Sequence, residues 1–366
     1  MSKVLSAYKS FRAWIAAQWW FAGFTACLGA FAGLLGSVYA TQIGGAFPLS
    51  LSFAVGPVIW EAVLFWVSLF AFGLFFGMGF KAQLDATNKL EQAIRTLPPK
   101  GFLIVFEDLF RITFATDSEL NQATSDLASL TETIVAALSG VVLLVRQFDT
   151  RNDHPRYSVN LMVFKPIKDI ESNELKKQIK FAEPGFNSAA WDGVLQLEPE
   201  FAYSVSGREA QPQKDQEVPP IMLPIPKPEY RSDKGKPTIL PGAPDVFCNP
   251  NRFAGFENTL QLATWCREHS GLRASIAEDI ERYFTEGPGK EIRSFISIPV
   301  VSPSSEEVLG VLNLNSNRDG FLLGEQAGLF VPLTTPFMLL ISRALAKYII
   351  LQKQAATAHN VPGHKE

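Results

Sequence analysis

The chain has 366 residues, of which 19% are charged, and carries a formal net charge of −3 at pH 7. The pI is about 5.9 and no run of Lys or Arg occurs. This balance excludes nucleic acid as an expected partner, because phosphate contacts need a basic face. The mean hydropathy of +0.10 is high, and the apolar excess lies near the N-terminus. The composition therefore predicts a membrane segment joined to a soluble region.

The N-terminal region has the pattern of a membrane hairpin. Residues 13–60 contain no charged residue, a run long enough for two spans of about 20 residues each. A secretory signal is the competing interpretation, but its apolar core of about 7–15 residues is shorter than this run. The sequence predicts transmembrane helices at residues 13–40 and 53–80, joined by a short external loop at residues 41–52.

Basic residues precede the first span and follow the second, whereas the connecting loop has none. The positive-inside rule therefore places both termini in the cytoplasm, with residues 1–12 as a cytoplasmic tail of a multi-pass protein of the plasma (inner) membrane. Each span also holds two glycines four residues apart, a spacing that allows close helix packing between the spans or in a homodimer. These glycines are Gly29 and Gly33 in the first span, and Gly73 and Gly77 in the second.

After the second span, residues 81–99 alternate apolar and polar side chains at helical spacing and end at a Pro-Pro pair. This pattern predicts an amphipathic linker helix, either a surface helix or a short coiled coil. A cytoplasmic domain is expected over residues 100–353, with a flexible tail at 354–366. A Pro-rich insertion at about residues 204–250 excludes continuous helix or a central strand there. It predicts either a flexible insertion or a long loop over a binding surface.

Periodicity predicts the order of elements in the soluble domain as a helix, several strands and a closing helix. Apolar residues at helical spacing predict the first helix at residues 118–139, with Thr116, Asp117 and Ser118 available as caps. Alternation and β-branched content predict the strands, and helical spacing predicts the last helix. The strands are expected at residues 156–164, 194–197, 292–301 and 308–316, and the last helix at 324–353.

Three of these segments resemble strands of GAF domains. They are residues 156–164 (RYSVNLMVF), 292–300 (IRSFISIPV) and 310–316 (GVLNLNS), followed by a Phe-containing turn at Phe321 and a final helix. The resemblance covers the two ends of the domain and departs from the family in the Pro-rich middle. It implies an α+β fold in which a GAF-like antiparallel sheet is flanked by N- and C-terminal helices on one face and carries a ligand pocket on the other.

Strand alternation gathers polar side chains on one face of this sheet, because successive residues point to opposite faces. A pocket on that face would suit a polar or anionic small molecule, whereas the alternative is a merely solvated face. The candidate ligand-binding residues are Ser158, Asn160, Met162, Arg293, Phe295, Ser297, Asn313 and Asn315, with Arg293 at the rim.

No catalytic or metal-binding constellation is expected. The four histidines are too few and too dispersed for a triad or a metal site, and Cys266 with His269 would supply only two ligands. Residues 287–290 (GPGK) lack the earlier glycine and the Ser or Thr of a phosphate-binding loop. The family's cyclic-nucleotide signature and the cysteine context of its bilin-binding members are also absent. The sequence predicts a protein that is not an enzyme and identifies no cofactor.

The leading hypothesis is a membrane-anchored sensory or regulatory protein. Its GAF-like domain would bind a small molecule and signal to a protein partner or to its own transmembrane hairpin. One alternative is a membrane effector that oligomerises and perturbs the bilayer when its soluble domain is triggered. Another is a non-catalytic membrane scaffold. The partners expected are the lipid bilayer, a small-molecule ligand and a signalling protein, with a homodimer left open.

Overall fold

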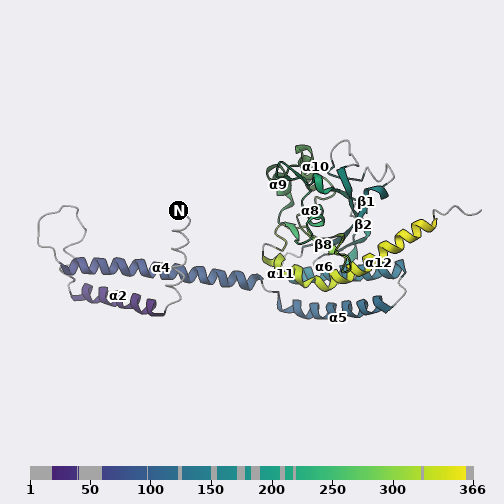
Figure 1. The fold of residues 1–366 in the computed structure, drawn as a ribbon. Coiled ribbons are helices and arrows are strands. Elements are labelled where there is room, and N and C mark those ends of the chain that lie inside the picture. The colour runs from purple at the N-terminus through teal and green to yellow at the C-terminus, as the bar shows by residue number, and fades with distance from the viewer. Residues whose placement is uncertain are drawn as a thin grey trace, which may run out of the picture. The chain divides into compact units, whose positions relative to one another are not determined.

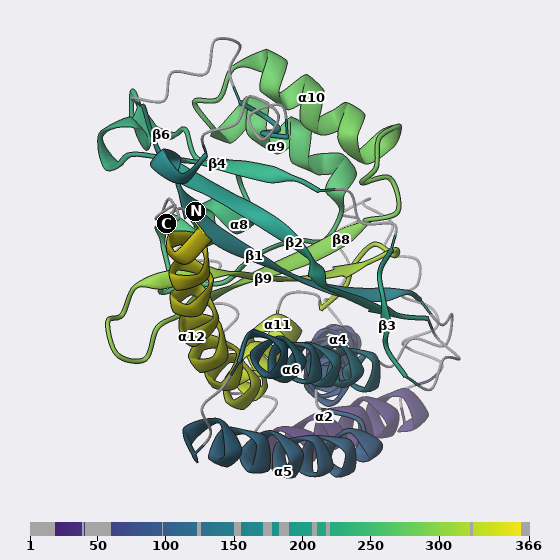
Figure 2. The same ribbon diagram turned by 90° about the vertical axis from the view of Figure 1, so that its right-hand side faces the viewer.

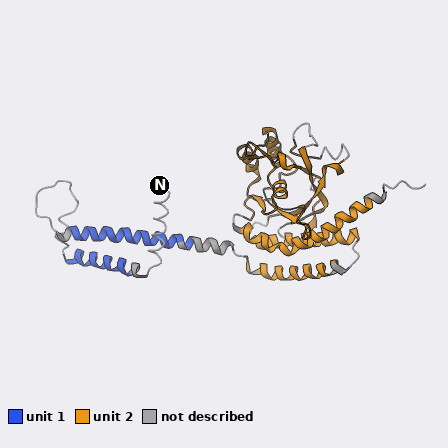
Figure 3. Cartoon of the chain, in the orientation of Figure 1, with its two compact units in different colours: residues 1–97 blue, residues 98–366 orange. Residues whose placement is uncertain are grey.

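A computed structural model of the protein describes residues 19–38, 40, 60–96, 98–122, 126–149, 155–170, 178–182, 190–206, 211–216, 220–322 and 325–359. The chain forms two compact units, Met1–Leu97 and Pro98–Glu366 (Figures 1 and 3). The predicted external loop and cytoplasmic N-terminal tail lie outside the described residues. The last helix continues to His359, past residue 354 where the flexible tail is expected to begin, and the rest of that predicted tail lies outside the described residues.

Two apolar helices pack together in the first unit. They are α2 (Trp19–Val38) and α4 (Trp60–Thr96). Within α4, Val63–Asp85 is long and apolar enough to cross a membrane, whereas Gly23–Val38 in α2 is a shorter apolar helix. The described parts of the two predicted spans are therefore helical, and their insertion into a bilayer stays a prediction.

The packing of α2 on α4 uses a different glycine spacing from the predicted one. A Cβ added to Gly29 would lie 2.9 Å from Cε2 of Phe72, and one added to Gly36 would lie 3.0 Å from Cε2 of Phe65. Gly29 and Gly36 lie seven residues apart in α2, and Phe65 and Phe72 lie seven residues apart in α4, which is about two helical turns in each helix. Each of the two rings therefore lies against one glycine. An added Cβ would meet nothing within 4 Å at the other predicted positions, Gly33, Gly73 and Gly77. Within the hairpin, only Gly29 of the predicted set makes a close contact.

Residues 81–96 of the predicted linker are helical. They form the C-terminal part of α4, which continues without a break to Thr96. The described helix ends at Thr96, ahead of the Pro98-Pro99 pair, a pair that is typical of the end of a helix. The next helix, α5, begins at Lys100.

The second unit is built on a mostly antiparallel sheet whose order is β3-β2-β1-β9-β8-β7, with β4 paired to β2. The strands are β1 (Tyr157–Pro166), β2 (Trp191–Val205), β3 (Gln213–Lys214), β4 (Met222–Pro226), β7 (Ala254–Phe256), β8 (Ser294–Val301) and β9 (Val308–Ser316). A separate ribbon joins β5 (Ser232–Asp233) to β6 (Lys236–Pro237). All four predicted strands are confirmed, and β1 lies between β2 and β9.

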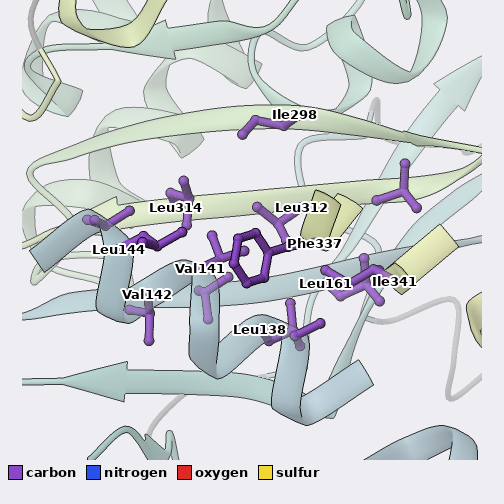
Figure 4. Packing of buried hydrophobic residues seen from close by; sticks show 14 of the residues in the cluster. Leu138, Val141, Val142, Leu144, Leu161, Ile298, Leu312, Leu314, Phe337 and Ile341 are labelled. Atoms are coloured by element: carbon purple, nitrogen blue, oxygen red, sulfur yellow. The ribbon is translucent and has the colours of Figure 1, made fainter. Parts of the chain in front are cut away.

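A helical layer covers one face of the sheet (Figure 2). It contains α6 (Leu127–Phe148), α11 (Glu325–Leu333) and α12 (Thr335–His359), and α5 (Lys100–Gln122) packs on α6 and α12 on the side away from the sheet. Leu138 and Val141 of α6 pack with Leu161 and Leu312 of the sheet and Phe337 of α12 (Figure 4). The helix α6 is apolar enough by composition to cross a membrane. Its apolar face is instead buried in this core, which accounts for its hydropathy.

Two predicted helices have different boundaries in the structure. The predicted helix at 118–139 is wrong: α5 runs to Gln122, and α6 begins after Asp126, whose side chain accepts a hydrogen bond from the Ser129 backbone N–H at 2.7 Å. Thr116 does not cap a helix, because its hydroxyl donates to the Ile112 carbonyl inside α5. The predicted helix at 324–353 is two helices, bent by 51° where α11 meets α12.

The opposite face of the sheet carries a covering layer formed by α8 (Ala243–Cys248), α9 (Leu262–His269) and α10 (Ala274–Thr285). Single 3-10 turns occur at η1 (Ile167–Asp169), η3 (Pro228–Tyr230) and η4 (Thr259–Gln261). The described part of the Pro-rich segment forms β4, the β5-β6 ribbon and α8, so it is neither continuous helix nor a central strand, as predicted. An antiparallel sheet with the N- and C-terminal helices of the unit on one face matches the expected α+β arrangement, and the helices of the covering layer on the other face were not predicted.

Candidate ligand-binding site

Three polar side chains form a hydrogen-bonded row across the middle of the sheet. Asn313 of β9 lies directly opposite Asn160 of β1 and Ser297 of β8 in the strand register. The Asn313 Nδ2 atom donates to Asn160 Oδ1 at 2.9 Å, and the Ser297 hydroxyl donates to Asn313 Oδ1 at 2.7 Å. All three residues are at most 9% exposed. This polar row is a buried network, so each bond in it counts for more than it would in water.

A cavity of about 120 Å³ lies between the polar row and the covering layer. Its floor comes from β1, β2, β8 and β9, and its other walls come from α8, α9, α10 and neighbouring loops. The lining residues are all uncharged: Asn160, Met162, Phe181, Leu197, Ile221, Leu223, Leu240, Pro241, Ala243, Leu262, Ile280, Tyr283, Phe284, Ile292, Phe295, Ser297, Asn313 and Asn315. An apolar wall with a few convergent polar groups is typical of small-molecule sites.

Tyr283 of α10 lines this cavity. Burial raises the pKa of Tyr283 to about 12, so the phenol stays protonated at neutral pH. Its ring is held edge-on by Phe181 at 5.5 Å and by Phe284 at 5.0 Å between ring centroids. Gly289 closes over the ring, since an added Cβ there would lie 2.2 Å from Tyr283 Cε1. The predicted turn at residues 287–290 thus packs against a cavity wall.

Six of the eight predicted site residues line this cavity: Asn160, Met162, Phe295, Ser297, Asn313 and Asn315. Ser158 lies along a neighbouring cavity instead. Arg293 is not among the lining residues of either cavity, and its Nε donates to Asp319 Oδ1 at 3.2 Å. The reason is its place just before β8, where its side chain reaches the turn that follows β9. The expected cationic rim is therefore not formed by this residue.

Sequence reasoning missed the covering layer and the helix α10 in particular. Ile276, Ile280 and Tyr283 recur at helical spacing, a signal that could have predicted this amphipathic helix. No comparable signal pointed to Gly242, which adopts a φ of 89° so that the chain passes close to the Phe295 ring. A Cβ at Gly242 would lie 2.8 Å from that ring. Only glycine adopts this conformation without strain.

The remaining chemistry of the described residues is not that of a metal or thiol site. Over those residues no group of three His, Cys, Asp or Glu side chains is placed to hold a metal ion. Burial raises the pKa of both Cys248 and Cys266 to about 11, which keeps them as unreactive thiols at neutral pH. His269 stacks on Trp265, with ring centroids 5.7 Å apart. Its predicted neighbour Cys266 is buried in the covering layer.

No family model and no curated protein matches this chain. Among solved structures, it is similar to the bacteriophytochrome RpBphP3 from the photosynthetic bacterium R. palustris, with 10% identity, a TM-score of 0.30 and coverage of 72% of this chain and 40% of that one. The chromophore-binding domain of the same protein gives 11% identity and a TM-score of 0.28, with coverage of 68% and 62%. In both cases this chain spans less than two thirds of the matched chain. Likeness at this level establishes neither a family nor a ligand for this protein.

Proposed function

We propose that the protein is a membrane-anchored sensory module whose second unit binds a small, neutral and largely apolar molecule. The supporting observation is the cavity over the polar row, in which an uncharged wall surrounds hydrogen-bonding groups. The sequence predicted a polar or anionic ligand, whereas the uncharged wall of this cavity favours a neutral one. An anion would lose its hydration here without meeting a cation, a cost of several kcal/mol.

The polar row keeps hydrogen-bonding capacity toward the cavity. The Asn160 side chain accepts through Oδ1, and no bond from its Nδ2 is made within the part of the chain that the structure describes. The Asn315 Nδ2 atom donates to Ser158 Oγ at 3.4 Å, and its Oδ1 has no partner among the described residues. Both residues line the cavity, so a ligand that bonds these atoms would be oriented by them as well as held.

Membrane anchoring is supported by the apolar Val63–Asp85 segment of α4 and the shorter apolar helix in α2. The test is fractionation: the full chain should stay with membranes after an alkaline carbonate wash, whereas residues 98–366 should be released. Reporter fusions at both ends would test the predicted cytoplasmic location of the termini. A full chain that washes off the membrane would contradict the anchoring.

A continuous set of contacts leads from the site to α5, the first helix of the second unit. Ser342 of α12 donates to the Val301 carbonyl at the end of β8 at 2.6 Å. One residue later, Arg343 bonds Asp117 of α5 at 2.6 Å, and Lys347 Nζ donates to the Leu120 carbonyl at 2.8 Å. A shift of β8 caused by the ligand would therefore reach the helix that follows the hairpin in the chain. Neighbouring residues of α12 thus join β8 to α5 through side-chain hydrogen bonds.

The first experiment is a thermal-unfolding screen of the full chain in lipid nanodiscs against neutral, anionic and cationic small molecules. A saturable rise in Tm for a neutral compound is expected, by mass action on the folded state. Ala243→Leu, which fills the cavity, should abolish the rise. Ala277→Leu is the matched control, because Ala277 is a buried alanine of the same layer that does not line the cavity.

Two outcomes would overturn the site assignment. One is a rise in Tm with anions alone, and the other is a rise that survives Ala243→Leu. Absence of any stabilising compound would favour the scaffold alternative, in which the fold is used for protein contacts.

A further inference from the structure

A second cavity, of about 110 Å³, adjoins the first one. The two cavities share five wall residues: Asn160, Leu197, Tyr283, Ile292 and Asn315. The two cavities are therefore neighbours, with the Tyr283 and Asn315 side chains on the walls of both. The second cavity differs from the first because its remaining wall is polar and charged.

The charged groups of the second cavity are one guanidinium and two carboxylates. Arg156 pairs with Asp215 at 3.0 Å and also donates to the Ser204 hydroxyl at 3.3 Å. The Asp215 side chain is only 6% exposed, so this pair belongs to the fold and its charges cancel locally. The second carboxylate, Glu291, is exposed and makes no ion pair or hydrogen bond within the part of the chain that the structure describes. The wall thus has an excess of one negative charge.

The neutral groups of this wall add acceptors. Asn315 is 7% exposed and lines both cavities. Its Nδ2 donates to Ser158, which leaves Oδ1 as an acceptor without a partner among the described residues. An ammonium group carries three donors and no acceptor, so it matches a carboxylate and an amide oxygen together. A carboxylate ligand would instead face Glu291 and the Asn315 oxygen, both of which repel it.

We infer that the two cavities form one site for a small amphipathic amine, with its hydrocarbon body in the first cavity and its ammonium group in the second beside Glu291 and Asn315. This inference rests on the proposed function and names its ligand class. The inferred ligand agrees with the proposed neutral one inside the first cavity, because its hydrocarbon body is neutral. Its single charge lies in the second cavity. The small volume of each cavity limits the ligand to a short or singly ringed hydrocarbon body.

The test compares three probes with the same unbranched five-carbon chain: pentylamine, pentan-1-ol and hexanoate. Calorimetric titration into the full chain in nanodiscs, with empty nanodiscs subtracted, gives each dissociation constant. We expect pentylamine to bind about five-fold tighter than pentan-1-ol, the effect of an ion pair at an exposed rim, and hexanoate to bind weakest. The preference for the amine should fall as salt is raised.

The deciding variant is Glu291→Gln. It should bring the dissociation constants of pentylamine and pentan-1-ol within about two-fold of each other and leave that of pentan-1-ol unchanged. Glu286→Gln is the matched control, since Glu286 is exposed on the same turn and lines neither cavity. The inference is overturned if hexanoate binds as tightly as pentylamine, if none of the three probes binds, or if Glu291→Gln keeps the amine preference. A further outcome separates the inference from the proposed function. If pentan-1-ol binds, loses its binding in Ala243→Leu and binds as tightly as pentylamine, the inference is overturned and the proposed function stands.

Discussion

The side-chain nitrogen of Asn313 donates to the side-chain oxygen of Asn160 across 2.9 Å, which joins β9 to β1 on the cavity face of the sheet. The same Asn313 amide accepts from Ser297 at 2.7 Å and so links a third strand. On the other face of β9, Leu312 and Leu314 pack into the main core. One strand therefore holds the hydrophobic core with alternate residues and builds the site with the residues between them.

Replacement of Asn313 by alanine should destabilise the second unit by about 2–4 kcal/mol, because it leaves Asn160 and Ser297 with unpaired buried groups. A double-mutant cycle with Asn160→Ala, measured by denaturant unfolding, should give a coupling energy of about 0.5–3 kcal/mol. Additive effects would mean that the hydrogen bond contributes nothing beyond the separate side chains.

Gly242→Ala should destabilise the unit more than Gly235→Ala does. Both glycines have positive φ, at 89° and 81°, and Gly242 also has a ψ of −129°, outside the left-handed helical region, so backbone strain adds to the cost of Gly242→Ala. Only at Gly242 would the new Cβ meet a ring, Phe295 at 2.8 Å, while at Gly235 it would meet nothing within 4 Å. The difference in Tm between the two variants measures the contact with Phe295 together with the backbone strain at Gly242, and equal effects would show that neither lowers stability. Ligand binding should weaken only in Gly242→Ala.

Gly140→Ala and Gly328→Ala should have opposite signs. Alanine is favoured over glycine inside a helix by about 1 kcal/mol. A Cβ at Gly140 would lie 2.9 Å from Phe337 Cε1, between α6 and α12, whereas one at Gly328 in α11 would meet nothing within 4 Å. We expect overpacking to make Gly140→Ala destabilising by about 1–2 kcal/mol, and Gly328→Ala to be stabilising. Stabilisation by both variants would show that the contact between α6 and α12 is loose.

Alkaline pH should destabilise the unit partly through Tyr283. The pKa of Tyr283 is about 12 in the folded state, whereas an ordinary exposed phenol has a pKa of 10.0, so both states are protonated below pH 10 and no stability is lost there. Between about pH 10 and 12 the unfolded state loses its proton first, and stability falls by up to about 2–3 kcal/mol.

Tyr283→Phe should remove this part of the alkaline loss, measured as the difference in unfolding free energy between pH 9 and the highest pH at which unfolding is reversible. The other groups whose pKa burial raises, including Cys248 and Cys266, remain in both proteins and cancel in the comparison. Identical alkaline slopes in the two proteins would show that Tyr283 is open to solvent. Ultraviolet difference titration of the wild type and the variant identifies the late-ionising phenol directly.

The alternation of β1 and β9 was sufficient to predict which side chains share a sheet face. Val159, Leu161, Leu312 and Leu314 enter the main core, and the residues between them face the cavity. Such local patterns are legible because a strand repeats every two residues whatever its partners. The membrane spans were likewise predicted from the length and apolarity of two segments. Their insertion into a bilayer stays a prediction.

Other features depended on which segments meet in space. The predicted helix at 118–139 failed because α5 is apolar enough to run through Thr116 and because Asp126 caps the next helix. The hydropathy of α6 is typical both of a membrane span and of a buried core helix. Only the burial of α6 against the sheet separates the two possibilities.

The sequence by itself determined the strands, the polar face and the lack of a basic surface, because these follow from the order and the charge of neighbouring residues. Only the tertiary structure decided the make-up of the candidate site. It turned Arg293 to Asp319, placed Glu291 and Asn315 on the wall of one cavity, and placed Tyr283 of α10 on the wall of the cavity that the polar row lines. These pairings join residues that are far apart in the chain, and their distances are set by strand order and helix packing, which no local pattern encodes.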